Sequence, residues 1–260
     1  MCATCGCGDE SGVRITTVGT PARPADGHQH HEHEHEHPGQ AISLEQRLLA
    51  KNDAQAELNR QWLRGHGVAL LNLMSAPGAG KTTLLEQTIR ALGAELALSV
   101  IEGDQETLLD SERIRATGCA AVQINTGAGC HLDAQMMAKG LAQLAPPPAS
   151  LVIVENVGNL VCPALFDLGE STRVVITAVT DGVDKPLKYP QMFRTAELVL
   201  VNKVDLLPYL DVEMEQFAAN VELVNPRARL LPISATRGDG MPAWFDHLRR
   251  LVPQPPTVVR

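Results

Sequence analysis

The sequence predicts an α/β fold in which helices cover both faces of a doubly wound, mostly parallel sheet. Short, nearly continuous apolar runs alternate with segments of helical pattern between residues 68 and 251, as expected for strands buried on both faces. A glycine-rich turn also joins the first apolar run to the next helical segment, which is the setting of a phosphate-binding P-loop. Ligands are therefore expected at the carboxyl ends of the strands.

Three parts of the chain are predicted. Residues 1–40 form a disordered, metal-binding tail rich in cysteine and histidine, residues 41–65 form a helix, and residues 66–260 form the P-loop domain with an internal metal site. The helix places Leu44, Leu48 and Leu58 on one side, and Ser43 is its predicted N-cap.

The remaining elements follow from hydrophobic periodicity. The predicted strands are residues 68–74, 96–101, 120–124, 151–154, 174–179, 198–201 and 230–233. The predicted helices are residues 82–92, 109–117, 132–144, 212–219 and 241–251.

Composition excludes several classes of function. The net charge of −8 and the aromatic content of 3% argue against a nucleic-acid partner. The chain lacks an apolar run of about 18 residues and a signal-peptide pattern, so no membrane association and a cytoplasmic location are expected. The six cysteines are then metal ligands or spectators rather than disulfides.

The P-loop has the sequence Ser-Ala-Pro-Gly-Ala-Gly-Lys-Thr at residues 75–82, with Ser75 where glycine is usual. Glycines let backbone N–H groups approach phosphate, the Lys81 amine can reach the β- and γ-phosphates, and the Thr82 hydroxyl can bind Mg²⁺. The alternative is an ordinary glycine-rich turn. The predicted nucleotide contacts here are Gly78, Ala79, Gly80, Lys81, Thr82 and Thr83.

Carboxylates follow two further strands. Asp104, after the strand at 96–101, is predicted to orient water or to hold Mg²⁺, although an acidic turn explains its position equally well. Glu155 takes the acidic position after the strand at 151–154, and the Gly158 N–H is available to the γ-phosphate. The predicted Mg²⁺ residues are Thr82, Asp104 and Glu155, and the predicted catalytic residues are Lys81, Asp104, Glu155 and Gly158.

A guanine signature, Asn202-Lys203-Val204-Asp205, follows the strand at 198–201. The Asp205 carboxylate can accept hydrogen bonds from guanine N1–H and N2–H, which adenine lacks. Lys203 can lie over the base and Asn202 can brace the loop. Ser234 and Ala235 follow the last strand and can offer a backbone N–H to guanine O6. The nucleotide is therefore predicted to be GTP.

The tail contains two metal-binding patterns. Cys2, Cys5 and Cys7, with the Met1 amine as a possible fourth ligand, suit tetrahedral Zn²⁺ or tetragonal Ni²⁺. Incidental cysteines in a disordered tail are the alternative. A histidine tract predicts a weak, multi-site metal reservoir, with an expression tag as its alternative. Its histidines are His28, His30, His31, His33, His35 and His37.

A second cluster is predicted inside the domain. Cys130 and His131 follow the strand at 120–124, and Cys162 follows the strand at 151–154. Two thiolates and an imidazole can bind Zn²⁺ or Ni²⁺, within one chain or across a symmetric dimer. Buried free cysteines are the alternative. Cys119 is predicted to be a core residue, and His66 and His247 surface or capping residues.

The combined motifs resemble HypB, a GTPase family that helps to insert nickel into [NiFe]-hydrogenase. The matching segments are Cys2-x-x-Cys5-Gly6-Cys7, residues 77–83, Glu102-Gly103-Asp104, residues 129–132, residues 155–159, residues 184–190 and Asn202-Lys203-x-Asp205. The resemblance implies a slow GTPase that dimerises with nucleotide, a high-affinity nickel site in the tail and a weaker nickel or zinc site at Cys130, His131 and Cys162. It also implies that residues 184–190 lie near the nucleotide or the dimer interface, and that the partners are HypA and the hydrogenase large-subunit precursor.

Three rival functions share these features: a urease-type nickel-insertion GTPase, a nickel storage protein with a vestigial GTPase, and a zinc-dependent regulatory GTPase. The cysteine-rich head of the tail favours the hydrogenase branch. Gly158 and Cys162 lie four residues apart, so a γ-phosphate bound by the first is expected to move the second.

Overall fold

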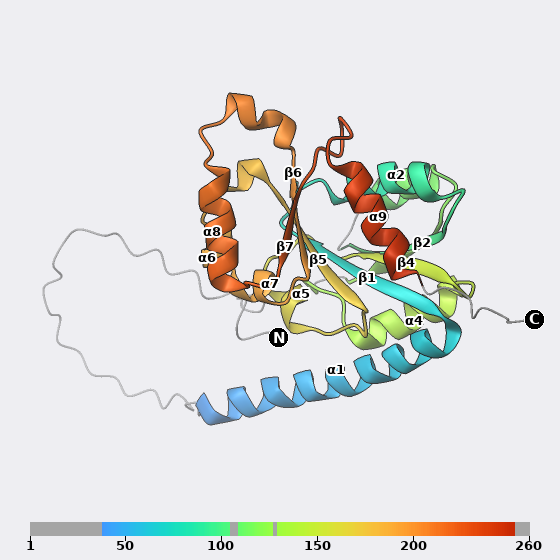
Figure 1. Cartoon of the computed structure of the whole chain (residues 1–260). Helices are drawn as coiled ribbons and strands as arrows, with labels where there is room; N and C mark the ends of the chain where they lie inside the picture. Colours follow the sequence, from blue (N-terminus) through green and yellow to red (C-terminus); the bar gives the residue numbers. More distant parts are fainter. Residues whose placement is uncertain (1–37, 105–108, 127–128, 253–260) are drawn as a thin grey trace, which may run out of the picture. The chain divides into compact units, whose positions relative to one another are not determined.

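The computed structural model describes residues 38–104, 109–126 and 129–252. The described residues form a seven-stranded sheet in the order β3-β2-β4-β1-β5-β6-β7 (Figure 1). Each neighbouring pair of strands runs parallel. The predicted α/β fold with a doubly wound sheet is therefore confirmed, and the sheet is parallel throughout.

The central strand is β1 (Val68–Ser75), and all eight of its residues are buried. Strands β2, β3 and β4 lie on one side of β1 and β5, β6 and β7 on the other, so the carboxyl end of β1 lies at the switch point where α/β sheets bind ligands. The other strands are β2 (Ala97–Asp104), β3 (Ala120–Asn125), β4 (Ser150–Glu155), β5 (Thr172–Ala178), β6 (Leu198–Asn202) and β7 (Arg229–Pro232).

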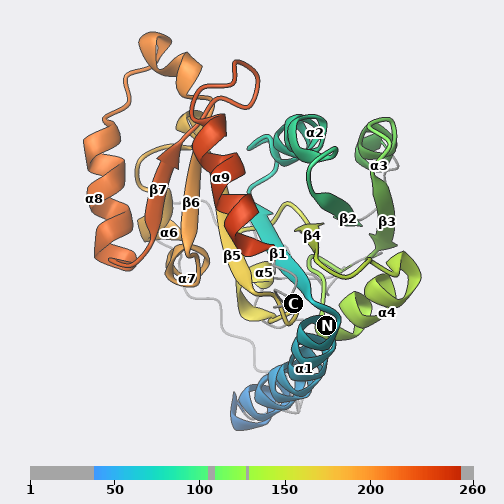
Figure 2. The same cartoon turned by 45° about the vertical axis from the view of Figure 1, so that its right-hand side comes forward.

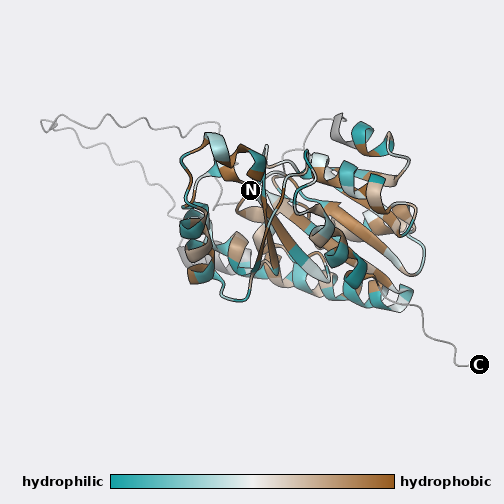
Figure 3. Ribbon diagram, turned by 45° about the horizontal axis from the view of Figure 1, so that its top comes forward, coloured by the Kyte–Doolittle hydropathy of each residue, from teal (hydrophilic) through white to brown (hydrophobic). Residues whose placement is uncertain are grey.

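Helices cover both faces of the sheet (Figure 2). One face packs against α2 (Lys81–Leu92), α3 (Leu109–Arg115) and α9 (Met241–Leu251). Trp244 of α9 is fully buried there and donates from Nε1 to Thr88 Oγ1 of α2 at 2.9 Å. The apolar strands and the mixed surfaces of the covering helices are visible in Figure 3.

The opposite face packs against α4 (Ala134–Leu144), α5 (Cys162–Leu165), α7 (Pro190–Arg194) and α8 (Met214–Val224). The short helix α6 (Lys185–Lys188) and two 3₁₀ segments, η1 (Val179–Asp181) and η2 (Val204–Tyr209), complete the described elements. Sequence periodicity missed α5, α6 and α7, because helices of four or five residues are too short to show it. Each of these three has a proline in its first turn, which is a helix-start signal.

The helix before the domain, α1, spans Pro38–His66 and extends past both predicted ends. Ser43 therefore lies inside the helix and is not its N-cap. From Leu49 onward, α1 belongs to the same compact unit as the sheet. Within this unit, Leu63 of α1 joins a buried cluster with Leu70 of β1 and Met137 of α4.

Among the helices of the described residues, none is long and apolar enough to cross a membrane.

Candidate nucleotide and metal sites

The P-loop connects the end of β1 to the start of α2. Gly78 and Gly80 have positive φ angles of 75° and 98°, which glycine adopts without steric cost. A Cβ on Gly80 would lie 2.5 Å from Asn202 Nδ2. The loop therefore approaches the guanine-signature segment so closely that only glycine fits at this position.

Two side-chain pairs lie at the base of this loop. Lys81 donates from Nζ to the Ser75 hydroxyl at 2.8 Å, and Ser75 is fully buried. Thr82 donates from Oγ1 to Glu155 Oε1 at 2.9 Å, and both residues are buried. A threonine hydroxyl beside a carboxylate at a P-loop is a donor set that suits Mg²⁺. Thr82 and Glu155 therefore fit the predicted magnesium role.

The guanine-signature segment is joined to two other loops. Asn202 donates from Nδ2 to the Ala79 carbonyl at 2.9 Å and accepts from the Ala235 N–H at 3.1 Å. Lys203 has a left-handed φ of 64° and donates from Nζ to the Gly78 carbonyl at 2.7 Å. Loops after β1, β6 and β7 thus form one connected surface. The Ala235 N–H already donates to Asn202 Oδ1. It can play its predicted role toward guanine O6 only if it shares its hydrogen between these two acceptors.

Asp205 is oriented by its neighbours. Ser234 donates from Oγ to Asp205 Oδ1 at 2.6 Å. Arg237 Nε lies 3.7 Å from Asp205 Oδ2, and the Arg237 side chain is 63% exposed. Arg237 was not identified from the sequence, because an arginine in a loop carries no motif signal.

The segment after β4 lies against the P-loop. A Cβ on Gly158 would be 3.2–3.3 Å from three atoms of Pro77. Asn156 is buried and donates from Nδ2 to Asn72 Oδ1 of β1 at 3.1 Å. Gly158 is thus close to the phosphate-binding turn, and its contact to the γ-phosphate stays a prediction.

Asp104 ends β2, in register with Asn125 of β3. Its backbone lies at the carboxyl edge of the sheet, and its side chain is outside the described part of the chain. The tail ligands Cys2, Cys5 and Cys7 also lie outside the described residues. The same applies to the tract histidines His28, His30, His31, His33, His35 and His37.

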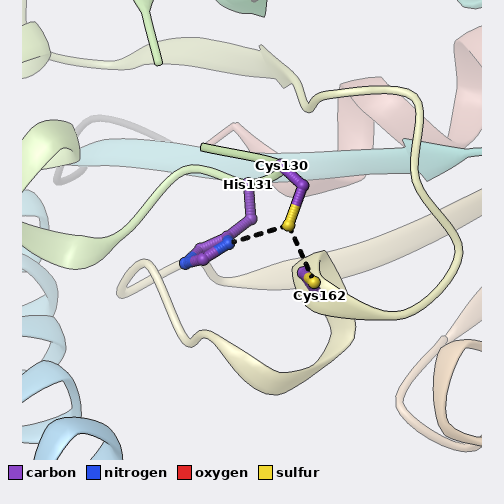
Figure 4. Close-up of side chains that lie close together, drawn as sticks. All are labelled: Cys130, His131 and Cys162. Carbon is purple, nitrogen blue, oxygen red and sulfur yellow. Dashed lines mark hydrogen bonds between the residues drawn. The ribbon is translucent and has the colours of Figure 1, made fainter. Parts of the chain in front are cut away.

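The structure brings the predicted internal metal ligands together (Figure 4). Cys130 Sγ lies 2.9 Å from Cys162 Sγ and 3.6 Å from His131 Nδ1. The ligand atoms of all three residues fall within 4.8 Å of one another. Cys130 and His131 follow β3 and Cys162 starts α5, so two separate loops supply the ligands. Two thiols and one imidazole form a donor set for Ni²⁺ or Zn²⁺.

A ring contact holds the His131 side chain. Its ring stacks on Phe166 with centroids 3.8 Å apart and an interplanar angle of 24°. Burial lowers the pKa of His131, although Asp133 opposes this shift. A lowered pKa keeps the imidazole neutral near pH 7, which is the form that binds metals. Phe166 was not identified from the sequence, since only the structure places it beside His131.

The other cysteine and histidines of the domain stand apart from this cluster. Cys119 is half-buried against the core, and burial raises its pKa to about 11. His66 is exposed and its ring stacks on Trp62. The prediction that His247 lies at the surface is wrong, because it is buried beside Trp244. His247 lies on the side of α9 that packs against the sheet.

A family model described as "CobW/HypB/UreG, nucleotide-binding domain" matches residues 69–232. The "Hydrogenase maturation factor HypB" of Rhizobium leguminosarum bv. viciae is 54% identical, over 80% of this chain and 69% of the relative. The chain belongs to the HypB family. The Escherichia coli K12 HypB is 51% identical, over 80% of this chain and 71% of its own length. The predicted resemblance is thereby confirmed, and the chain is a member of a P-loop GTPase family of hydrogenase maturation factors.

Solved HypB structures share this fold. HypB from Archaeoglobus fulgidus superposes with a TM-score of 0.73 at 42% identity, covering 77% of this chain and 98% of that one. HypB from Helicobacter pylori, solved in complex with nickel, gives a TM-score of 0.72 at 34% identity, covering 77% and 94%. The matched part of this chain in the family model contains the P-loop, the cysteine–histidine cluster and the guanine signature.

Proposed function

We propose that this chain is a GTP-hydrolysing nickel metallochaperone that helps to insert nickel into the large subunit of [NiFe]-hydrogenase. The nucleotide state controls metal binding and transfer. The observation that carries this proposal is the short segment after β4, which holds Gly158 beside the P-loop and Cys162 beside Cys130. A nucleotide site and a metal site therefore share one loop.

GTP is the proposed nucleotide because Asp205 presents a carboxylate where guanine offers two N–H donors. The contacts of Asn202 and Lys203 to P-loop carbonyls support this assignment, because they join the segment that carries Asp205 to the phosphate-binding turn. Magnesium, when bound with the nucleotide, neutralises charge on the β- and γ-phosphates. Thr82 and Glu155 would hold it.

Hydrolysis follows from the same residues. The Lys81 amine moves from the Ser75 hydroxyl to the β- and γ-phosphates and stabilises the charge that develops on them. The Gly158 N–H binds a γ-phosphate oxygen. Asp104, from the carboxyl end of β2, orients the attacking water.

Nickel is the proposed cargo. The thiols of Cys130 and Cys162 with the His131 imidazole form the internal site, which also accepts Zn²⁺. The nickel complex of H. pylori HypB supports this assignment, since that protein shares the fold. Cys2, Cys5 and Cys7 form the tighter tail site, and the histidine tract serves as a weak store.

The proposed partners are a HypA-type nickel chaperone and the precursor of the hydrogenase large subunit. A homodimer, promoted by nucleotide or metal, is the proposed active assembly. These are the partners that the family resemblance of the sequence implies.

The catalytic part is tested by GTP turnover of the full chain with Mg²⁺. Lys81→Ala should reduce turnover by at least a hundredfold, because the lysine binds the phosphates on which charge develops. Lys139→Ala, at an exposed position of α4, is the matched control and should keep full activity. Turnover that survives in Lys81→Ala contradicts catalysis at this P-loop and favours a storage protein.

The metal part is tested by nickel titration of the full chain. Replacement of Cys2, Cys5 and Cys7 by alanine should remove the tighter event and leave a weaker thiolate-bound one. Further replacement of Cys130 and Cys162 should remove that event too. Cys119→Ala is the control and should change neither. A thiolate-bound event that persists after all five replacements contradicts the assignment.

A further inference from the structure

The two loops that carry the internal metal ligands are not held together by the sheet. The Cys130 loop (residues 129–134) follows β3, and the Cys162 loop (residues 162–169) follows β4. Strand β2 lies between β3 and β4. The strands that precede the two loops are therefore not hydrogen-bonded to each other. Contacts outside the sheet must fix the distance between the metal ligands of the two loops.

Two asparagines of α1 bridge these loops. Asn52 accepts from the Ala134 N–H at 2.9 Å and donates to the Asp167 carbonyl at 2.8 Å. Asn59 donates to the Ala134 carbonyl at 2.7 Å and to the Leu168 carbonyl at 3.0 Å. Each asparagine side chain thus contacts both loops. Both asparagines bind Ala134 of the Cys130 loop, and they bind the neighbouring residues Asp167 and Leu168 of the Cys162 loop.

The bridge is buried and closely packed. Asn52 and Asn59 are only 7% and 4% exposed, and their spacing of seven residues puts them on one face of the helix. A Cβ on Gly169 would lie 2.6 Å from the Ala56 carbonyl oxygen and 2.8 Å from Asn59 Cβ. The backbone of the Cys162 loop therefore rests directly on α1, where water cannot replace the amide groups.

An ion pair and a ring contact reinforce the same arrangement. Arg60, next to Asn59, donates from one nitrogen to both carboxylate oxygens of Asp167 at 2.9 and 2.7 Å. Phe166 of the Cys162 loop stacks on His131 of the Cys130 loop. The two asparagines are the part of this arrangement that joins the backbones of both loops.

We infer that Asn52 and Asn59 are positioning residues for the metal site, which hold the Cys130 loop and the Cys162 loop at the separation that metal binding requires. The inference rests on the proposed function, because it assumes that Cys130, His131 and Cys162 bind metal. Partners that orient metal ligands without touching the ion typically change metal affinity by about 10- to 100-fold when they are replaced.

The test uses the full chain with Cys2, Cys5 and Cys7 replaced by alanine, and nickel alone as the probe. Nickel affinity at the internal site is measured by competition with a chelator. The sulfur-to-nickel charge-transfer absorption is followed because histidines of the tail do not produce it. Asn59→Asp removes both donated hydrogen bonds and should weaken nickel binding about tenfold or more.

Asn52→Asp is the milder second variant. It keeps an oxygen to accept from the Ala134 N–H and loses only the donation to the Asp167 carbonyl. Its nickel affinity should fall in the same direction but less. This variant keeps the inference testable if Asn59→Asp does not fold.

Asn225→Ala is the matched control. Asn225 is also buried and donates to the carbonyls of Phe193, Arg194 and Ala196, which connect α7 to β6. Its replacement should lower stability by a comparable amount and leave nickel affinity unchanged. An equal loss of nickel affinity in Asn225→Ala overturns the inference, because the effect is then one of general stability.

The remaining outcomes separate the inference from the proposed function. If the background variant shows no sulfur-to-nickel absorption, the internal metal site is wrong and the inference fails with it. If the absorption is present but both asparagine variants bind nickel as tightly as the background, only the inference is overturned. If both asparagine variants bind nickel more weakly than the background and their GTP affinity is unchanged, the inference is supported.

Discussion

At the residue scale, the proposed selectivity for guanine depends on one carboxylate. Asp205 is held by the Ser234 hydroxyl on Oδ1 and lies near Arg237 through Oδ2. Both neighbours are hydrogen-bond donors that orient the carboxylate, whose oxygens are the acceptors that guanine N1–H and N2–H require. The Arg237 side chain is mostly exposed, so it can move aside when a base enters.

Asp205→Asn should change the base preference. Loss of two charged hydrogen bonds, each contributing about 1.5 kcal/mol, weakens GTP binding about a hundredfold. The amide can instead donate to the 2-oxo group of xanthine, so affinity for xanthosine triphosphate should rise. Fluorescent-nucleotide competition measures both effects. Asp211→Asn, at an exposed position after η2, is the control and should preserve the GTP preference. If Asp205→Asn still prefers GTP, Asp205 does not select the base.

A second residue-scale feature is the buried imidazole of α9. Burial, followed by the charges of Arg229 and Arg250, lowers the pKa of His247 to about 4. Nδ1 lies 3.0 Å from the Arg229 guanidinium. The folded state therefore resists protonation of this ring.

This lowered pKa gives a pH dependence with a definite sign. Between the ordinary pKa of 6.5 and about 4, the unfolded chain binds a proton at His247 that the folded chain does not. Stability is therefore lost as pH falls through this range, by on the order of 2 kcal/mol. His247→Phe should remove this part of the loss. Urea unfolding of the unsubstituted chain and of His247→Phe at pH 7 and pH 4.5 measures this difference. If the free energy of unfolding falls equally in both proteins, the prediction is contradicted.

At the element scale, the strand-to-helix turn after β1 is built around a single close contact. The Ala79 carbonyl accepts from Asn202, and Gly80 leaves room for that amide. The P-loop and the guanine-signature loop are therefore mutually positioned, and a disturbance of one should reach both ends of the nucleotide.

Gly80→Ala should disrupt this turn. A Cβ would meet Asn202 Nδ2 at 2.5 Å, on a backbone with a φ of 98°. Strain of about 1–3 kcal/mol is expected, so nucleotide affinity should fall at least tenfold. Gly65→Ala in α1 is the matched control, because its Cβ meets no atom within 4 Å. It should leave nucleotide binding unchanged and stabilise the helix slightly.

Element type was largely predictable from the sequence, because buried parallel strands are short apolar runs and the longer helices show periodicity. Element ends were less predictable. The helix expected at 212–219 is Met214–Val224 in the structure, and α1 begins before its expected cap. Local patterns do not contain the tertiary contacts that set these ends.

The sites were predictable where a motif carries the chemistry. Cys130 and Cys162 were placed together because parallel strands bring their following loops to one sheet edge, and the sulfurs lie 2.9 Å apart. Phe166, Asn52 and Asn59 were not found, since their roles come from packing between distant segments. Asparagines on a helix give no local signal of the loops that they bridge.

At the scale of the whole molecule, the parallel sheet places both sites along its carboxyl edge. The P-loop follows β1, and the metal loops follow β3 and β4. Between Gly158 and Cys162 the chain is tightly folded, since Asn159 donates its N–H to the Val157 carbonyl at 2.7 Å and accepts from the Val161 N–H at 2.8 Å. We therefore expect a displacement at Gly158 to reach Cys162 instead of being absorbed by the segment between them.

The nucleotide state should consequently change metal affinity at the internal site. Under the proposed function, we expect a γ-phosphate bound to the Gly158 N–H to shift Cys162 relative to Cys130, and GDP to leave it in place. A coupling free energy of about 1–3 kcal/mol predicts a 5- to 150-fold difference in nickel affinity. The measurement titrates nickel into the variant lacking Cys2, Cys5 and Cys7, bound to GDP or to a non-hydrolysable GTP analogue.

Linkage supplies the control for this experiment. If nucleotide changes nickel affinity by some factor, nickel must change the affinity ratio of the two nucleotides by the same factor. Cys162→Ala should abolish both effects while GTP still binds. Equal nickel affinities in the two nucleotide states exclude the coupling, even if each site functions alone. A difference that persists in Cys162→Ala shows that the coupling follows a route other than the Gly158–Cys162 segment.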